Sequence, residues 1–192
     1  MARRFASLLA IVLSVGWCVA TAGSGIASDG KFEGELVFKP LDDGRNFEVV
    51  SEFSYTDPLG VRWPVPKGTK TDGASVPRWA WSVFPPFAGK HLKAAVVHDY
   101  YCQTKTKPWE AVHRVFYDAL RTAGVDWISA KTMYAAVYRF GPKWLPGGSA
   151  VRAVSTGTTP EQQKQKFEDI QGWIKRENPS IKEIEKRLRK LK

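Results

Sequence analysis

Hydrophobic residues change their spacing once along this chain, and the change falls near residue 76. From Lys31 to Val65, apolar and polar residues alternate, which is the period of strands with one buried face. After residue 76, apolar residues recur every three or four positions, which is the period of amphipathic helices. A strand region followed by a helical region predicts an α+β fold.

The strand region predicts a small antiparallel β-meander. The stretches "FEGELVF" and "NFEVVSEFSY" alternate in polarity, and Asp42–Gly44 between them is a hairpin-turn sequence. A second turn sequence at Asp57–Gly60 precedes "VRWPV", a short third strand. Pro64 cannot donate a ladder hydrogen bond, so this strand is expected at a sheet edge.

The helical region predicts a three- to four-helix cluster. Ser75 is an N-cap candidate for the first helix, and Gly124 is a C-terminal signal for the third. Asp126 is expected to cap the fourth helix, and Gly141–Pro142 to close it. The expected helices are Ser75–Phe84, Lys90–Cys102, Pro108–Gly124 and Asp126–Phe140.

The last part of the chain predicts a basic helical tail with two helix starts. Thr159 with Gln162 and Ser180 with Glu183 have capping-box spacing. The final helix is expected to dock by an apolar stripe, with a basic contact to an anionic membrane as the alternative. The stripe consists of Ile181, Ile184, Leu188 and Leu191.

The first residues have the pattern of an export signal. Arg3 and Arg4 precede an uncharged run over residues 5–28, and Ala20–Ala22 offers the small residues that a signal peptidase reads. We expect cleavage after Ala22 and a periplasmic or secreted protein. The alternative is an uncleaved N-terminal membrane anchor, because the uncharged run is long enough to span a bilayer.

A Gly/Ser/Thr-rich stretch, "LPGGSAVRAVSTGT", separates the helical cluster from the tail and is expected to be a linker. The expected organisation is a signal peptide at 1–22, a single α+β domain at 31–145, a linker at 146–158 and a basic helical tail at 159–192.

The net charge favours anionic partners. The formal charge is +10, and it becomes +8 once Arg3 and Arg4 leave with the signal peptide. A basic exported protein favours an anionic envelope component, either cell-wall acids or lipid head groups. Nucleic acid is an unlikely partner because the charge is spread along the chain and no phosphate-binding Gly-rich motif is present. Cleavage would leave Cys102 as the one cysteine and exclude an internal disulfide.

Acids, histidines and a serine gather in two short motifs and a nearby helix. Asp72 and Ser75 belong to the turn-like stretch "KTDGASVPR", and His98 and Asp99 to the apolar stretch "VVHDYY". His113 lies on the following expected helix. If that helix and the one carrying His98 form an antiparallel pair, these side chains can meet at one mouth.

One interpretation is a metal site for hydrolysis. Two imidazoles and a carboxylate with an open position suit Zn²⁺ or another divalent ion that activates water. The expected ligands are Asp72, His98 and His113, with Asp99 as the orienting or acid–base group. The chain has no HExxH motif or other tight ligand spacing.

Two further interpretations need no metal. His98 could act as general base, oriented by Asp72 or Asp99, with Ser75 as nucleophile, although the Gly-x-Ser-x-Gly elbow is absent. The other interpretation is structural: Asp72 and Ser75 cap local backbone and His98 braces the loop. Cys102 lies one helical turn after His98 and is expected to be a small buried apolar side chain.

These motifs resemble a family of uncharacterised proteins from bacteria and tailed phages, a domain of unknown function. The hallmark segments are Thr71–Pro77, "TDGASVP", His98–Tyr101, "HDYY", and His113–Phe116, "HRVF". The resemblance extends from Phe32 to Gly141. His113 stands where many relatives carry an Asp, and either residue can bind a metal.

The resemblance brings no established activity, but it implies one shared site. That site would be built from Asp72, Ser75, His98 and Asp99. The leading functional hypothesis is an exported basic protein with a hydrolase-like, metal-dependent site that acts at the cell envelope. The alternative is a noncatalytic envelope-associated or phage-derived interaction module, in which the motif residues only hold the loop.

Overall fold

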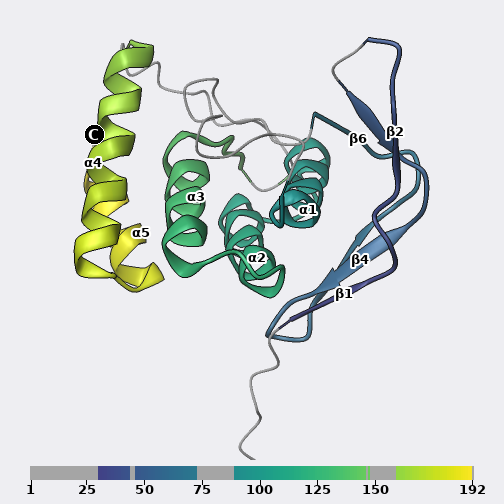
Figure 1. The fold of residues 1–192 in the computed structure, drawn as a ribbon, viewed down its shortest axis with the longest axis horizontal. Coiled ribbons are helices and arrows are strands. Elements are labelled where there is room, and N and C mark those ends of the chain that lie inside the picture. The colour runs from purple at the N-terminus through teal and green to yellow at the C-terminus, as the bar shows by residue number, and fades with distance from the viewer. Residues whose placement is uncertain (1–29, 44–45, 73–88, 146, 148–158, 192) are drawn as a thin grey trace, which may run out of the picture.

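The fold is described from a computed structural model over residues 30–43, 46–72, 89–145, 147 and 159–191. Strands lie at one end of the molecule and helices follow in order across it (Figure 1). The chain is therefore α+β, with the strands in its N-terminal part and a helical C-terminal part, which confirms the expected fold class.

The strands form two small antiparallel sheets of three strands each. One has the order β1 (Lys31–Glu33), β4 (Phe53–Thr56), β5 (Arg62–Val65). The other has the order β2 (Phe38–Pro40), β3 (Phe47–Val49), β6 (Lys70–Thr71).

Each of the two longer expected strands is thus divided between both sheets. Gly34, between β1 and β2, has a φ of +82°, and a Cβ there would lie 3.0 Å from the Glu52 carbonyl oxygen. This left-handed backbone ends the pairing of β1 with β4 and redirects the chain into β2.

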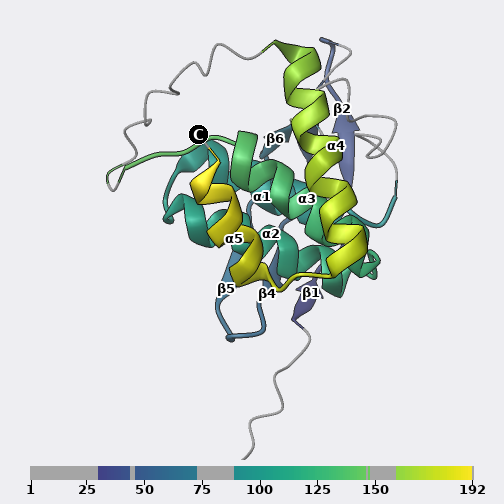
Figure 2. The ribbon, with the colours of Figure 1, turned by 90° about the vertical axis from the view of Figure 1, so that its left-hand side faces the viewer.

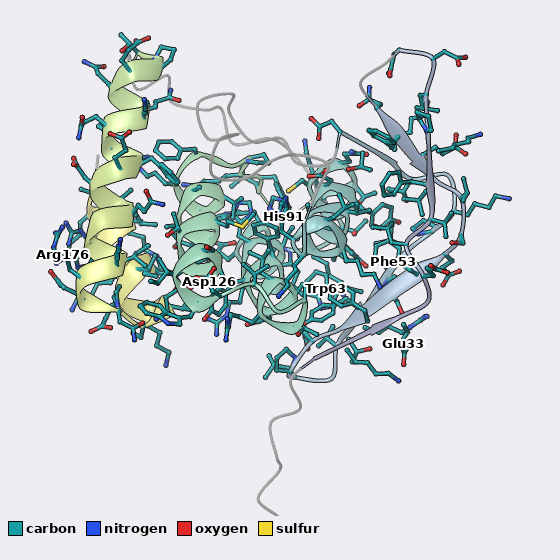
Figure 3. All side chains as sticks on the ribbon, viewed as in Figure 1. Glu33, Phe53, Trp63, His91, Asp126 and Arg176 are labelled. Atoms are coloured by element: carbon teal, nitrogen blue, oxygen red, sulfur yellow. The ribbon has the colours of Figure 1, made fainter. Side chains whose placement is uncertain are left out.

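The turn before β5 is held by one buried carboxylate. Asp57 Oδ1 accepts hydrogen bonds from the backbone N–H groups of Leu59 and Val61, both at 2.9 Å. Asp57 Oδ2 accepts from Trp63 Nε1 at 2.9 Å. Trp63, labelled in Figure 3, packs edge-on against Tyr101, which lies in the helix Leu92–Thr104, with ring centroids 4.9 Å apart. The predicted turn at Asp57–Gly60 therefore also joins the sheet to the helices.

Three consecutive helices form the centre of the molecule: α1 (Leu92–Thr104), α2 (Trp109–Thr122) and α3 (Trp127–Phe140). Helix α1 lies between the strands and α2 (Figure 1), and seven of its residues are buried. A helix covered on two sides is expected to be apolar around most of its surface, which explains the sequence "AAVVHDYY".

Helix α3 begins and ends where the sequence predicts, after Asp126 and before Gly141. Asp126 is the N-cap, and its Oδ1 accepts from the Ser129 N–H at 3.0 Å. Hydrogen bonds from the Ser129 side chain and then from its backbone N–H favour the ionised carboxylate and lower the pKa of Asp126. Gly141 follows the last helical residue. Gly124, after α2, has a φ of +78°, as expected for a glycine that ends a helix.

The tail contains α4 (Pro160–Glu177) and α5 (Ile181–Lys190), and both begin with the predicted capping boxes. Figure 2 shows both helices on the α3 side of the molecule. Their apolar residues and those of α3 form a second core. Ile181, Ile184 and Leu188 are buried there, but Leu191 follows the helix and is 42% exposed, so the expected stripe is one residue too long.

Some expected features lie outside the described residues. These are the signal peptide at 1–22, the short helix Ser75–Phe84 and nearly all of the linker at 146–158. Among the helices that the structure describes, none combines the length and the apolar character needed to cross a membrane.

Helix α5 is predicted to stabilise the molecule through Ile184, which has no exposed surface. Ile184→Ala should lower the free energy of unfolding by about 2–5 kcal/mol, because it leaves a cavity in the second core. Leu191→Ala is the matched control on the same segment and should change stability by less than about 0.5 kcal/mol. Urea denaturation measures both, and equal losses would contradict the docking of α5.

Candidate functional site

Two histidines from neighbouring helices meet in the interior. His98 on α1 and His113 on α2 lie with Nε2 and Nδ1 2.9 Å apart, so one ring donates a hydrogen bond to the other. His98 is 8% exposed and His113 is completely buried. The expected pairing of these two helices, which would bring the histidines together, is therefore present.

Cys102 lies close to the two histidines. It follows His98 by four residues on α1, and this spacing places both side chains on one face. Its Sγ lies 3.5 Å from His98 Nε2 and 3.8 Å from His98 Nδ1. One ligand atom from each of His98, Cys102 and His113 lies within 4.8 Å of the others, and no other group of three in the described residues does so. We refer to these three residues as the His/Cys cluster.

A carboxylate flanks the cluster on the other side of His98. Asp99 Oδ1 lies 3.9 Å from His98 Nδ1. Asp99 Oδ2 accepts a 2.7 Å hydrogen bond from Thr71 Oγ1, and both residues are buried. Gln103 Nε2 also donates to the Lys70 carbonyl at 3.0 Å. These two bonds fasten β6 to α1, and Asp72 is the residue that follows Thr71 at the end of β6.

Aromatic rings and one close backbone contact enclose the histidines. His98 packs on Phe116 at 4.8 Å between centroids, and His113 lies 5.4 Å from Trp109 and 6.4 Å from Trp144. A Cβ at Gly141 would lie 2.3 Å from the Val137 carbonyl oxygen and 3.2 Å from His113 Cε1. A glycine is therefore needed where the end of α3 covers His113.

Burial keeps His113 neutral. The pKa of His113 is lowered from 6.5 to about 2, first by loss of solvation and then by the charges of His98 and Lys143. A hydrogen-bond contact with the Pro142 backbone acts in the opposite direction. Its Nε2 is buried and forms no hydrogen bond of good geometry with the described residues. A neutral imidazole is the form that binds metals.

The thiol of Cys102 is also in its neutral form. Burial first, and the charge of Asp99 second, raise the pKa of Cys102 from 9.0 to about 12. A protonated thiol is a poorer nucleophile than a thiolate. A metal ion would displace this proton, because thiolate is the ligand form of cysteine.

Two distances within the cluster are close to those between the ligands of one zinc ion. Zinc bonds of about 2.0–2.1 Å to nitrogen and about 2.3 Å to sulfur place tetrahedral ligand atoms about 3.3–3.6 Å apart. The distance of 3.5 Å between Cys102 Sγ and His98 Nε2 fits, and 2.9 Å between the ring nitrogens is slightly short. Two nitrogens and a sulfur suit zinc or another borderline ion.

The structure brings some of the expected site residues together and leaves others apart or undescribed. His98 and His113 are brought together, and Asp99 lies next to His98. Asp72 is not part of the His/Cys cluster, so its role as a ligand remains a prediction. Ser75 lies outside the described residues. Cys102 was expected to be an apolar filler, and its i, i+4 spacing from His98 is the signal that points to the cluster.

The fold and the buried cluster define a small α+β protein with a candidate metal centre. Residues 47–137 match the family model described as "Protein of unknown function (DUF1353)". This confirms the resemblance to a family of uncharacterised proteins. The matched segment contains Thr71, Asp99 and all three members of the His/Cys cluster.

Two curated relatives, both from Sinorhizobium fredii, are similar to part of the chain. "Uncharacterized protein y4jT" is 46% identical over 59% of this chain and 34% of its own length. "Uncharacterized protein y4iH" is 42% identical over 50% of this chain and 42% of its own length. The alignments therefore span well under half of each relative. No solved structure matches the chain significantly.

The bond between Thr71 and Asp99 is predicted to stabilise the contact between β6 and α1. Thr71→Val should lower the free energy of unfolding by about 1–3 kcal/mol, because the buried carboxylate loses a donor. Thr132→Val is the matched control: its buried hydroxyl donates to the Ile128 carbonyl, a helical acceptor, and its loss should cost about 0.5 kcal/mol or less. Equal losses in urea denaturation would contradict the proposed contribution of Thr71.

Proposed function

We propose that His98, Cys102 and His113 bind one divalent metal ion, with zinc as the best match, and that this centre hydrolyses a substrate at the cell envelope. The observation that carries the proposal is the convergence of three ligand atoms within 4.8 Å. The neutral state of the buried His113 adds support, because neutral imidazole is the ligand form.

Three protein ligands leave a fourth position, which a water molecule takes in catalytic zinc sites. A metal ion held by His98, Cys102 and His113 would supply the activation of water that hydrolysis needs. Asp99 would orient His98 from its other ring nitrogen, as carboxylates do for metal-bound histidines. Asp72, next to Thr71 on the chain, is the candidate for proton transfer or for a fourth ligand.

The proposed location follows from the sequence. The Arg3–Arg4 pair, the uncharged run over residues 5–28 and the small residues Ala20–Ala22 are typical of an export signal. A net charge of +10 favours the anionic polymers and lipid head groups of the envelope.

One observation favours a second candidate, a noncatalytic envelope-associated or phage-derived interaction module. His113 has no exposed surface and His98 only 8%, whereas a hydrolytic centre must admit substrate. In this second proposal, the metal or the hydrogen bonds of the His/Cys cluster only hold α1, α2 and the β6 loop together.

Metal analysis tests the centre that the first proposal requires. The purified protein should retain about one equivalent of zinc or a similar ion by elemental mass spectrometry, because three preformed ligands converge. His98→Ala and Cys102→Ala should lose it. His91→Ala is the matched control: His91, labelled in Figure 3, is a buried histidine at the start of α1 and is not a member of the His/Cys cluster. Wild-type protein without metal, or equal metal in all variants, would contradict the centre.

Isolated cell walls separate the two candidates. Zinc-loaded protein should release soluble fragments, and a chelator or His98→Ala should abolish the release, because both remove the activated water. Chromatography of the supernatant measures the fragments. Wall binding that survives Asp72→Ala and releases nothing would support the interaction module and contradict the hydrolytic proposal.

A further inference from the structure

A second site-like feature lies where α2 begins and where α3 and α5 end. Side chains there enclose a pocket of about 470 Å³. Aromatic rings and cations dominate its lining. The residues that matter for its chemistry are Trp109, Glu110, Tyr138, Arg139, Lys143 and Arg189.

Lys143 is held over the aromatic wall of this pocket. Its Nζ lies 5.0 Å from the centroid of the Trp109 ring and 5.9 Å from that of Tyr138. Partial burial, and then the charge of Arg139, lower the pKa of Lys143, while Glu110 acts in the opposite direction. A cation in this setting is stabilised by any anion that enters the pocket.

The positive charges that line the pocket are only partly neutralised by nearby carboxylates. Among the described residues, no carboxylate lies within 4.0 Å of the charged nitrogens of Lys143 or Arg139. Arg189 is positioned by a 2.7 Å hydrogen bond to the Tyr138 hydroxyl and a 3.4 Å contact with Glu185. Three cations against Glu110 give the lining a formal charge of +2.

We propose that this pocket binds the phosphate group of an organic phosphate, with the anion facing Lys143, Arg139 and Arg189 and the carbon part resting on Trp109. A phosphate monoester carries a charge of about −1.5 to −2 at neutral pH, which matches the lining better than the single charge of a carboxylate. Arginine and lysine side chains are the usual partners of phosphate oxygens.

The ligand has two possible sources with the same chemistry: a soluble phosphate ester or the head group of an anionic phospholipid. Leu188 and Leu191 of the α5 segment also line the pocket and offer an apolar contact beside the cations. None of the pocket residues belongs to the His/Cys cluster, so this proposal does not depend on a bound metal.

Calorimetry with glycerol 3-phosphate tests the soluble source on the full chain. Saturable binding is expected, and Lys143→Gln or Arg139→Gln should weaken it about tenfold, because each removes one charge-assisted contact. Lys131→Gln is the matched control, since Lys131 also lies over a tryptophan, Trp127, at 5.2 Å, away from the pocket. Circular dichroism checks that each variant is folded.

Vesicles test the lipid source. Sedimentation with vesicles that contain phosphatidic acid, whose head group is a phosphate monoester, is compared with pure phosphatidylcholine vesicles. It should show binding that both pocket variants weaken and Lys131→Gln does not. Pocket-dependent binding of either ligand supports the proposal and identifies the source.

Three results would overturn the proposal. One is the absence of saturable binding to both ligands, and another is binding that both pocket variants leave unchanged. The third is phosphate binding that disappears with a chelator, because it would place the anion on the metal centre. Phosphate binding by wild-type protein that retains no metal on purification would instead contradict only the metal centre and its hydrolytic function.

Discussion

The packing of α1 against α2 buries two imidazoles that meet through their ring nitrogens, and the candidate centre exists because of this contact. His98 and His113 satisfy each other through one hydrogen bond of 2.9 Å, which leaves His113 Nε2 without a well-formed partner in the described residues. An unpaired polar atom in a dry interior costs about 1–3 kcal/mol. Such a cost is typical of positions kept for chemistry rather than for stability.

The sheets and the helices contribute different parts of the surroundings. The second sheet ends in β6, whose Thr71 donates a hydrogen bond to Asp99 beside His98. Helix α2 and the end of α3 enclose His113 with Trp109 and Gly141. The His/Cys cluster therefore lies between α1 and α2, with β6 attached next to it, while α4 and α5 form a separate core with α3.

Local signals predicted most helices well, because capping depends on neighbouring residues. Asp126 and the capping boxes at Thr159 and Ser180 begin helices as expected. The division into two sheets was missed because the left-handed backbone at Gly34 depends on its close approach to Glu52, the residue before β4, which lies 18 positions further along the chain.

The site was predictable only in part for the same reason. The motif "VVHDYYC" shows that His98 and Cys102 share a helix face. Which face turns toward His113 is decided by how α1 packs between the sheet and α2, and a local pattern does not contain that information. The apolar setting favoured a filler role for Cys102, whereas the helix pairing places its sulfur beside an imidazole.

Trp109 forms a shared wall, with one side on His113 and the other on the basic pocket. Close-packed interiors have few voids that could absorb a moved ring. A substitution at Trp109 would therefore alter the packing around His113 and the lining of the pocket at the same time.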